Sequence, residues 1–198
     1  MWALVESGSV TKVYTRPRPL SIGDVNYPSN IFTLWSSSEL EALGIYEVVI
    51  DNTNLKKQEY YINTDQTFAF ASGAVTASYG TPTARSIADT LFTAQDETDG
   101  LGTEGEVKTT GLKTTHKESI NQTASGLLQA TDWYSIRAAD GGTAVPSSVS
   151  NHRTAVRTKA NSMCTAIDNA SDIDALIALY VYNDATPPVR PLGDFPTL

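Results

Sequence analysis

Hydrophobic positions change their spacing about half-way along the chain. In the first part, large apolar side chains occupy every second position of short runs, as Phe68 and Phe70 do, and this period of two is typical of half-buried strands. In the second part they recur every three to four residues, which is typical of amphipathic helices. The pattern predicts an α+β chain with a β-rich N-terminal domain over residues 1–80, a linker over 81–111 and a helical domain over 112–198.

The first domain is expected to form a small antiparallel sheet with one short helix. Residues 1–15 predict a hairpin around the turn residues Ser7-Gly8-Ser9. A short helix is expected over residues 39–43, because Ser36-Ser37-Ser38 offers N-caps and Gly44 suits the position after its last turn. The remaining strands are expected at 45–50, 59–63, 67–71 and 74–79.

Residues 81–111 have an ambiguous pattern. A helix is conceivable over 84–95, whereas 95–110 is acidic and rich in Gly and Thr, which indicates a linker. The run from Gly100 to Gly105 spells G-x-G-x-x-G, but the dinucleotide-binding motif must follow a buried strand and open a helix. The acidic residues before and inside this run would repel a pyrophosphate. We interpret it as a loop and expect no cofactor.

The second domain is expected to be an antiparallel helical hairpin followed by a third helix. The two apolar stripes of the hairpin are Leu112, His116, Ile120, Ala124, Leu127 and Leu128, and then Val149, His152, Val156, Ala160, Met163 and Ile167. The third helix is expected to begin at Ser171-Asp172-Ile173-Asp174, with Asp174 at the capping-box position. The Pro-rich C-terminal tail is expected to be extended.

Composition excludes several classes of protein. The 198 residues hold 14 Lys and Arg against 22 Asp and Glu, for a net charge of -8, and the bases are interleaved with acids rather than clustered as a phosphate-binding surface requires. We therefore expect no nucleic-acid partner. No apolar run is long enough to span a membrane, and the single cysteine, Cys164, rules out a disulfide framework. The N-terminus shows no signal peptide, so we expect the protein to stay in the cytoplasm where it is made, or to assemble there.

The sequence contains no evident catalytic or metal constellation. The only two histidines, His116 and His152, fall on the apolar stripes of different helices, where a core role is expected. The carboxylates suggest no acid/base pair, and neither a nucleophile elbow nor a P-loop is present. We therefore expect no enzymatic activity, no catalytic residue, no cofactor and no metal.

Five residues are candidates for partner binding. Tyr60 and Tyr61 are adjacent in an expected strand, so one faces each side of the sheet and the outer one is available to a partner, unless it is simply a lone exposed tyrosine. Trp133 is expected to pack between the two long helices, and it belongs to the partner interface if it is exposed instead. Arg153 and Arg157 lie four apart on one helix face, where they form a solvated edge, make intrahelical pairs, or meet an acidic or carbonyl-rich partner.

The helical half resembles a known family. The run Leu127-Leu128-Gln129-Ala130-Thr131-Asp132-Trp133, followed by Arg137, Pro146 and the segment from His152 to Arg157, resembles a C-terminal module of bacteriophage tail proteins of the tail-fibre assembly chaperone or tail assembly chaperone group. This resemblance covers roughly residues 112–198. The first part of the chain, with Trp2–Glu6, Tyr27–Ser36 and Gly44–Tyr46, resembles the N-terminal region of small tail-associated phage proteins.

The resemblance implies a structural role in a phage tail. It suggests a non-enzymatic subunit that binds the tail fibre or the baseplate and stays in the virion after assembly in the host cytoplasm. The alternative is a transient chaperone that protects fibre subunits and then leaves, and a homo-oligomer is left open in either case. An enzyme acting on host glycans is a third hypothesis, but it would need a pair of carboxylates in a cleft, and the sequence suggests none.

Overall fold

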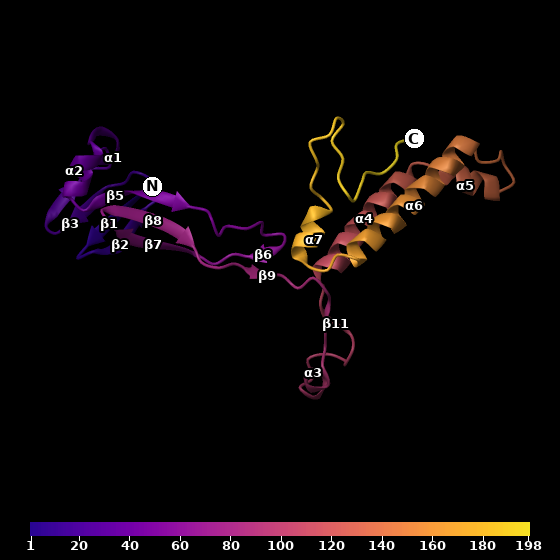
Figure 1. Cartoon of the computed structure of the whole chain (residues 1–198), viewed down its shortest axis with the longest axis horizontal. Helices are drawn as coiled ribbons and strands as arrows, with labels where there is room; N and C mark the ends of the chain where they lie inside the picture. The colour runs from indigo at the N-terminus through magenta and orange to yellow at the C-terminus, as the bar shows by residue number, and fades with distance from the viewer. The chain divides into compact units, whose positions relative to one another are not determined.

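The computed structural model describes all residues 1–198, and it has an α+β fold (Figure 1). The chain divides into two compact units, Met1–Ala84 and Arg85–Leu198. The first is built mainly from strands and the second mainly from helices, as the change in hydrophobic spacing predicts. None of the helices is both long and apolar enough to cross a membrane.

The first unit is organised around a five-stranded sheet with the strand order β2-β1-β5-β8-β7. The expected hairpin is present as β1 and β2, with a turn at Ser7 and Gly8. A second hairpin, β7–β8, turns at Ser72 and Gly73. The strands of the sheet are β1 (Trp2–Glu6), β2 (Ser9–Tyr14), β5 (Ile45–Asp51), β7 (Gln66–Ala71) and β8 (Ala74–Tyr79).

The sheet is mixed, so the expectation of a purely antiparallel sheet is wrong. β5 and β8 pair in parallel, with Val48 opposite Val75 and Val49 opposite Thr76. Between them the chain leaves the sheet through the loop that holds β6 (Tyr61–Ile62) and returns as β7. The second hairpin then inserts β8, rather than β7, beside β5. The alternation of side chains along each strand does not predict whether β7 or β8 pairs with β5.

Apolar side chains form a separate cluster on each face of the sheet. On one face, Leu4, Tyr14 and Ile45 pack against two short helices, α1 (Ile31–Leu34) and α2 (Ser37–Ala42). On the other face, Ala3, Val48, Val75 and Ala77 form a second cluster with partly buried aromatics from β5 and β7. The edge strands β2 and β7 approach each other, so the sheet curls around this second cluster.

Local sequence signals account for α2, but not for its neighbours. Ser36, one of the expected N-caps, forms a capping box with Glu39, and Gly44 follows the helix with a φ of 80°, a conformation that favours glycine. The structure adds α1 and a two-stranded hairpin of β3 (Leu20–Ile22) and β4 (Val25–Tyr27), which the sequence analysis did not predict. These elements have four residues or fewer, which is too short for a periodic pattern.

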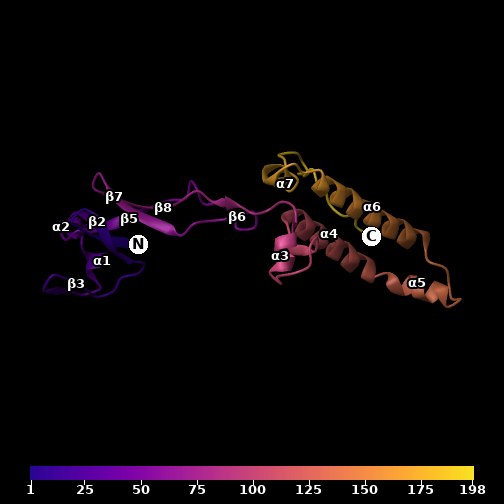
Figure 2. The ribbon, with the colours of Figure 1, turned by 90° about the horizontal axis from the view of Figure 1, so that it is seen from below.

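The expected helical hairpin dominates the second unit. It consists of α4 (Leu112–Gln129) and α6 (Ser147–Asp168), which pack side by side (Figures 1 and 2). α4 buries Leu112, His116, Ile120 and Ala124 of its predicted stripe, whereas Leu127 is exposed and Leu128 is half-buried. On α6 the buried side chain after Val149 is Arg153, whereas the neighbouring His152, predicted for the stripe, is only half-buried.

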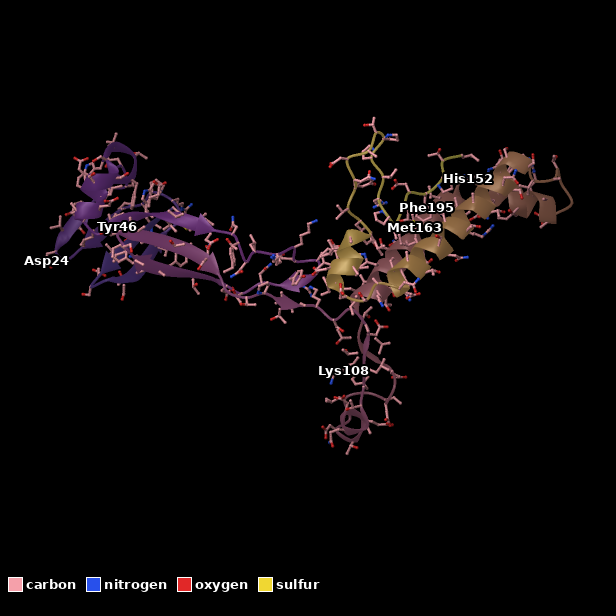
Figure 3. The ribbon with its side chains drawn as sticks, viewed as in Figure 1. Asp24, Tyr46, Lys108, His152, Met163 and Phe195 are labelled. Carbon is pink, nitrogen blue, oxygen red and sulfur yellow. The ribbon has the colours of Figure 1, made fainter.

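The C-terminal region folds back on the helices instead of extending away. Helix α7 (Ile173–Ala178) is capped by Asp172, whose carboxylate accepts a hydrogen bond from the backbone of Ala175. The cap is therefore Asp172, and the expected capping-box role of Asp174 is wrong. The tail then returns along α6, where Leu192 is buried and Phe195 lies over the helix in Figure 3.

The segment 81–111, expected to be a linker, contains ordered elements. Thr83–Ala84 (β9) pairs with β6, and β10 (Thr90–Leu91) pairs with β11 (Val107–Thr109). The loop of the β10–β11 hairpin contains α3 (Ala94–Thr98), which is closed by a capping box of Thr93 and Asp96. The helix conceived over 84–95 is absent, because its centre forms the strand β10.

Acid should open the α3 turn. Hydrogen bonds from Lys108 and from the backbone and hydroxyl of Thr93 lower the pKa of Asp96 from 3.8 to about 2. Because the pKa of Asp96 is lower in the folded turn than in the unfolded chain, its ionised carboxylate stabilises the turn at pH values above the ordinary pKa. This stabilisation disappears as the pH falls towards the pKa of the folded state. We expect the amide resonances of Thr93 and Asp96 to report loss of the turn between about pH 4 and about pH 2. In Asp96→Asn this transition should be missing, and an unchanged transition would contradict the assignment.

Candidate functional site

Four polar contacts join Leu128, Thr131, Asp132 and Arg153 at one corner of the helical unit. α4 ends there, Thr131 follows, and α5 (Asp132–Ala139) begins at once. Arg153 reaches this corner from α6. One of its terminal nitrogens donates to the carbonyl of Leu128 at 2.8 Å and to the hydroxyl of Thr131 at 2.7 Å, and the other donates to the carboxylate of Asp132 at 2.8 Å.

Arg153 therefore has a role inside the chain. Its side chain is buried, and so is Thr131, whose hydroxyl donates in turn to the carbonyl of Leu128. The guanidinium adds a charged donor to the Leu128 carbonyl at the C-terminal end of α4, which also accepts the backbone N–H of Thr131, and it pairs with the first residue of α5. The expectation of a solvated edge is therefore wrong for Arg153, whose guanidinium is buried and bonded within the chain.

Trp133 lies on the surface rather than between the long helices, so its predicted burial is wrong. Half of its side-chain surface is exposed. Its ring lies on that of Tyr134, with centroids 3.8 Å apart, and the guanidinium of Arg137 lies 4.9 Å from the Trp133 centroid and 5.3 Å from that of Tyr134. The tryptophan belongs to the first turn of α5, whereas the interior between α4 and α6 is filled by the side chains of their own stripes.

Helix α5 buries none of its residues. Ile136 on the same helix is 62% exposed. Arg137 also donates to the carbonyl of Thr143, which ties the loop after α5 back to the helix. We call the surface made by Trp133, Tyr134, Ile136 and Arg137 the aromatic corner. Tryptophan, tyrosine and arginine are the residues enriched among binding hot spots.

Truncation of Trp133 should have little effect on stability. Because half of the indole surface is exposed and its ring contacts are with Tyr134 and Arg137 of a helix that buries none of its residues, we expect Trp133→Ala to lower the free energy of unfolding by about 1 kcal/mol or less. A buried tryptophan would cost about 3–5 kcal/mol. Urea unfolding followed by circular dichroism distinguishes the two, and a loss in the larger range would show that the indole is buried in solution.

A groove of about 460 Å³ lies between α4 and α6, next to this corner. Its floor includes the small buried side chains of Ala124 and Ala160. The polar residues that line it are Asn121, Ser125, Asp132, Arg153, Arg157 and Asn161. Arg157 is exposed and makes no hydrogen bond or ion pair within the chain, so it stays a candidate for partner binding.

The two candidate tyrosines are separated from this site in the sequence and belong to the other unit. Tyr60 is buried, with 3% of its surface exposed, and Tyr61 is half-buried in β6. The expected exposed tyrosine is therefore wrong. β6 comprises only Tyr61 and Ile62, so the face alternation of a long strand does not apply to Tyr60, and the exposed residue is Ile62.

The remaining chemical motifs take up structural positions. His116 is buried, and its Nδ1 lies 2.7 Å from the hydroxyl of Tyr180. The run from Gly100 to Gly105 follows α3 and precedes the strand β11, which is the reverse of the strand-to-helix order of a dinucleotide-binding turn. No group of three or more His, Cys, Asp or Glu side chains is arranged to hold a metal ion.

Comparisons with protein-family models, curated proteins and solved structures find no match for this chain. Among the five candidates, Trp133 and Arg157 lie exposed on the same unit, whereas Arg153 holds the corner together. Exposure of Ile136 was not predicted from the sequence, because a single isoleucine in a short helix gives no periodic signal.

Proposed function

We propose that this chain is a non-enzymatic tail-associated protein of a tailed bacteriophage that binds the tail fibre or the baseplate as a connecting subunit of the virion. The observation that supports this most is that residues of the two sequence segments that carry the resemblance, 127–133 and 152–157, meet in the fold. Leu128, Thr131, Asp132 and Arg153 are joined by hydrogen bonds at the corner where α4 ends. Trp133 and Arg137, which also carry the resemblance, then form the exposed aromatic corner.

The aromatic corner has the composition expected of a protein interface. An exposed indole, a stacked tyrosine and an arginine lie together on a helix that buries none of its own residues. The Arg153 contacts fix the start of this helix, so the corner is presented without a large ordering cost on binding. A structural subunit requires such a preformed surface and no catalytic group.

Mass spectrometry of gradient-purified particles tests the proposal. In a phage that encodes this chain, we expect its peptides at a fixed small ratio to the major tail protein. If the chain is absent from particles but bound to fibre protein in infected lysate, it acts as a transient chaperone. Absence from both would overturn a tail function altogether.

The substitution Trp133→Ala tests whether the aromatic corner binds the partner. Trp133→Ala should remove most of the binding to the fibre or baseplate protein while leaving the fold intact, because truncation of an interface tryptophan commonly costs about 2 kcal/mol or more of binding. The matched control is Tyr182→Ala, an exposed aromatic near the C-terminus, which should bind as the unaltered chain does. Equal binding by Trp133→Ala would exclude the corner from the interface.

A further inference from the structure

We propose that the groove between α4 and α6 binds an extended acidic segment of a partner polypeptide, with Arg157 holding its carboxylate. The proposal rests on the proposed function for the statement that the partner is a protein. The chemistry of the ligand is inferred from the groove itself.

The groove is lined by one row of side chains from each helix. On α6, Arg153, Arg157 and Asn161 follow at intervals of four residues, so they share one face. On α4, Asn121 and Ser125 form the facing row. The helices run antiparallel: Arg153 contacts Leu128 at one end, and the thiol of Cys164 lies 3.9 Å from the amide oxygen of Asn121 at the other. Arg157 therefore lies in the middle of the groove.

Several polar groups in the groove have no partner in the chain. The side chains of Ser125, Arg157 and Asn161 make no hydrogen bond within the chain, and all three are exposed. A side-chain amide can donate to a backbone carbonyl and accept from a backbone N–H, as an extended peptide requires. The guanidinium presents a planar set of donors that matches a carboxylate. The groove thus offers polar side chains that can bind a peptide backbone and one guanidinium that can bind a carboxylate.

Charge distinguishes this groove from the rest of the protein. The chain carries a net charge of -8, but residues 112–168 hold six Lys and Arg against four Asp and Glu. Within the groove, Asp132 is paired with Arg153, which leaves the charge of Arg157 uncompensated. An acidic segment is attracted to this site, whereas a basic one is repelled by Arg157.

The dimensions fit a short segment. The eight-residue separation of Arg153 and Asn161 corresponds to about 12 Å along a helix. An extended chain covers that distance with about four residues, at roughly 3.3 Å each. A segment of this length places one acidic side chain, or a C-terminal carboxylate, at Arg157 and its backbone near the two asparagines.

Fluorescence anisotropy with labelled synthetic peptides tests the proposal on the full chain. The probes are a C-terminally amidated peptide of Glu-Ser repeats, its Gln-Ser counterpart, and the Gln-Ser peptide with a free C-terminal carboxylate. We expect the Glu-Ser peptide to bind at least about tenfold more tightly than the amidated Gln-Ser peptide, or about 1.4 kcal/mol. If the free-carboxylate Gln-Ser peptide binds as well as the Glu-Ser peptide, the ligand is a chain terminus; if it does not, the ligand is an acidic side chain.

The matched variants are Arg157→Gln and Lys159→Gln. Both remove one positive charge from α6, but Lys159 faces a different groove, beside the C-terminal segment. Arg157→Gln should weaken Glu-Ser binding about tenfold, and Lys159→Gln should leave it nearly unchanged, with the same thermal melting for both. Equal losses in the two variants, or equal binding of the acidic and neutral peptides, would overturn the proposal.

Two further measurements test the location of the binding site and the identity of its occupant. Peptide-induced shifts in NMR spectra should fall on the amides of Asn121, Ser125 and Asn161, and shifts confined elsewhere would overturn it. Sedimentation equilibrium that shows a dimer dissociated by Arg157→Gln would assign the groove to a second copy and overturn a heterologous partner. Because these experiments need no phage, they can fail while the tail function holds, and they can succeed while it fails.

Discussion

Replacing Arg153 with Ala is expected to lower the free energy of unfolding of the helical unit by about 3 kcal/mol. The side chain makes hydrogen bonds to Leu128, Thr131 and Asp132, and it is buried beside a buried threonine. Its removal leaves the carbonyl at the end of α4 and the Thr131 hydroxyl oxygen without their charged donor. The half-exposed Asp132 carboxylate can recover water, which keeps the loss below that of a fully buried ion pair.

Urea unfolding monitored by the helical circular dichroism signal measures this loss. The control is Arg157→Ala, four residues along the same helix, which removes an exposed arginine without partners and should change the free energy by about 0.5 kcal/mol or less. Arg153→Lys should recover only part of the loss, because an ammonium cannot span the three acceptors as the guanidinium fork does. Equal stabilities of Arg153→Ala and Arg157→Ala would contradict the contacts described for this corner.

The contrast between these two arginines shows where sequence reasoning reached its limit. A spacing of four residues correctly places Arg153 and Arg157 on one face of α6. It does not reveal that the end of α4 faces Arg153 alone, because this depends on where the first helix stops and how the two helices cross. Trp133 was misplaced for the same reason: the short helix α5 starts immediately after Thr131 and turns the indole away from the interior.

Long periodic segments could be predicted well from the sequence. The two stripes define α4 and α6 closely, because buried positions on a long helix repeat often enough to reveal their period. The β1–β2 hairpin, the β7–β8 hairpin and the capping box of α2 have equally local signals. The parallel pairing of β5 with β8 has no local sequence signal, because the segment that holds β6 and β7 separates the two strands.

The segment before α4 caps this helix in a way that the sequence does not predict. Its Gly, Thr and acidic residues indicate a linker by composition, yet Asp89 accepts a hydrogen bond from the backbone of Gly111 and a second from the hydroxyl of Thr114. The backbone carbonyls of Ser86 and Ile87 accept from the N–H groups of Leu112 and Lys113. These contacts satisfy donors in the first turn of α4 that no helical carbonyl can reach. A capping segment about 25 residues away from its helix has no local sequence signature.

Gly111→Ala is therefore expected to lower the free energy of unfolding by about 3 kcal/mol. A Cβ at this position would lie 2.3 Å from the backbone carbon of Ala88 and 2.4 Å from its oxygen, so the capping segment must move away and leave helix donors unsatisfied. The control is Gly126→Ala within α4, where a Cβ meets nothing within 4 Å. This substitution should instead stabilise the helix by about 0.5–1 kcal/mol. Urea unfolding of both variants should show opposite signs, and a stabilising Gly111→Ala would mean that the backbone of Ala88 does not pack against the start of α4.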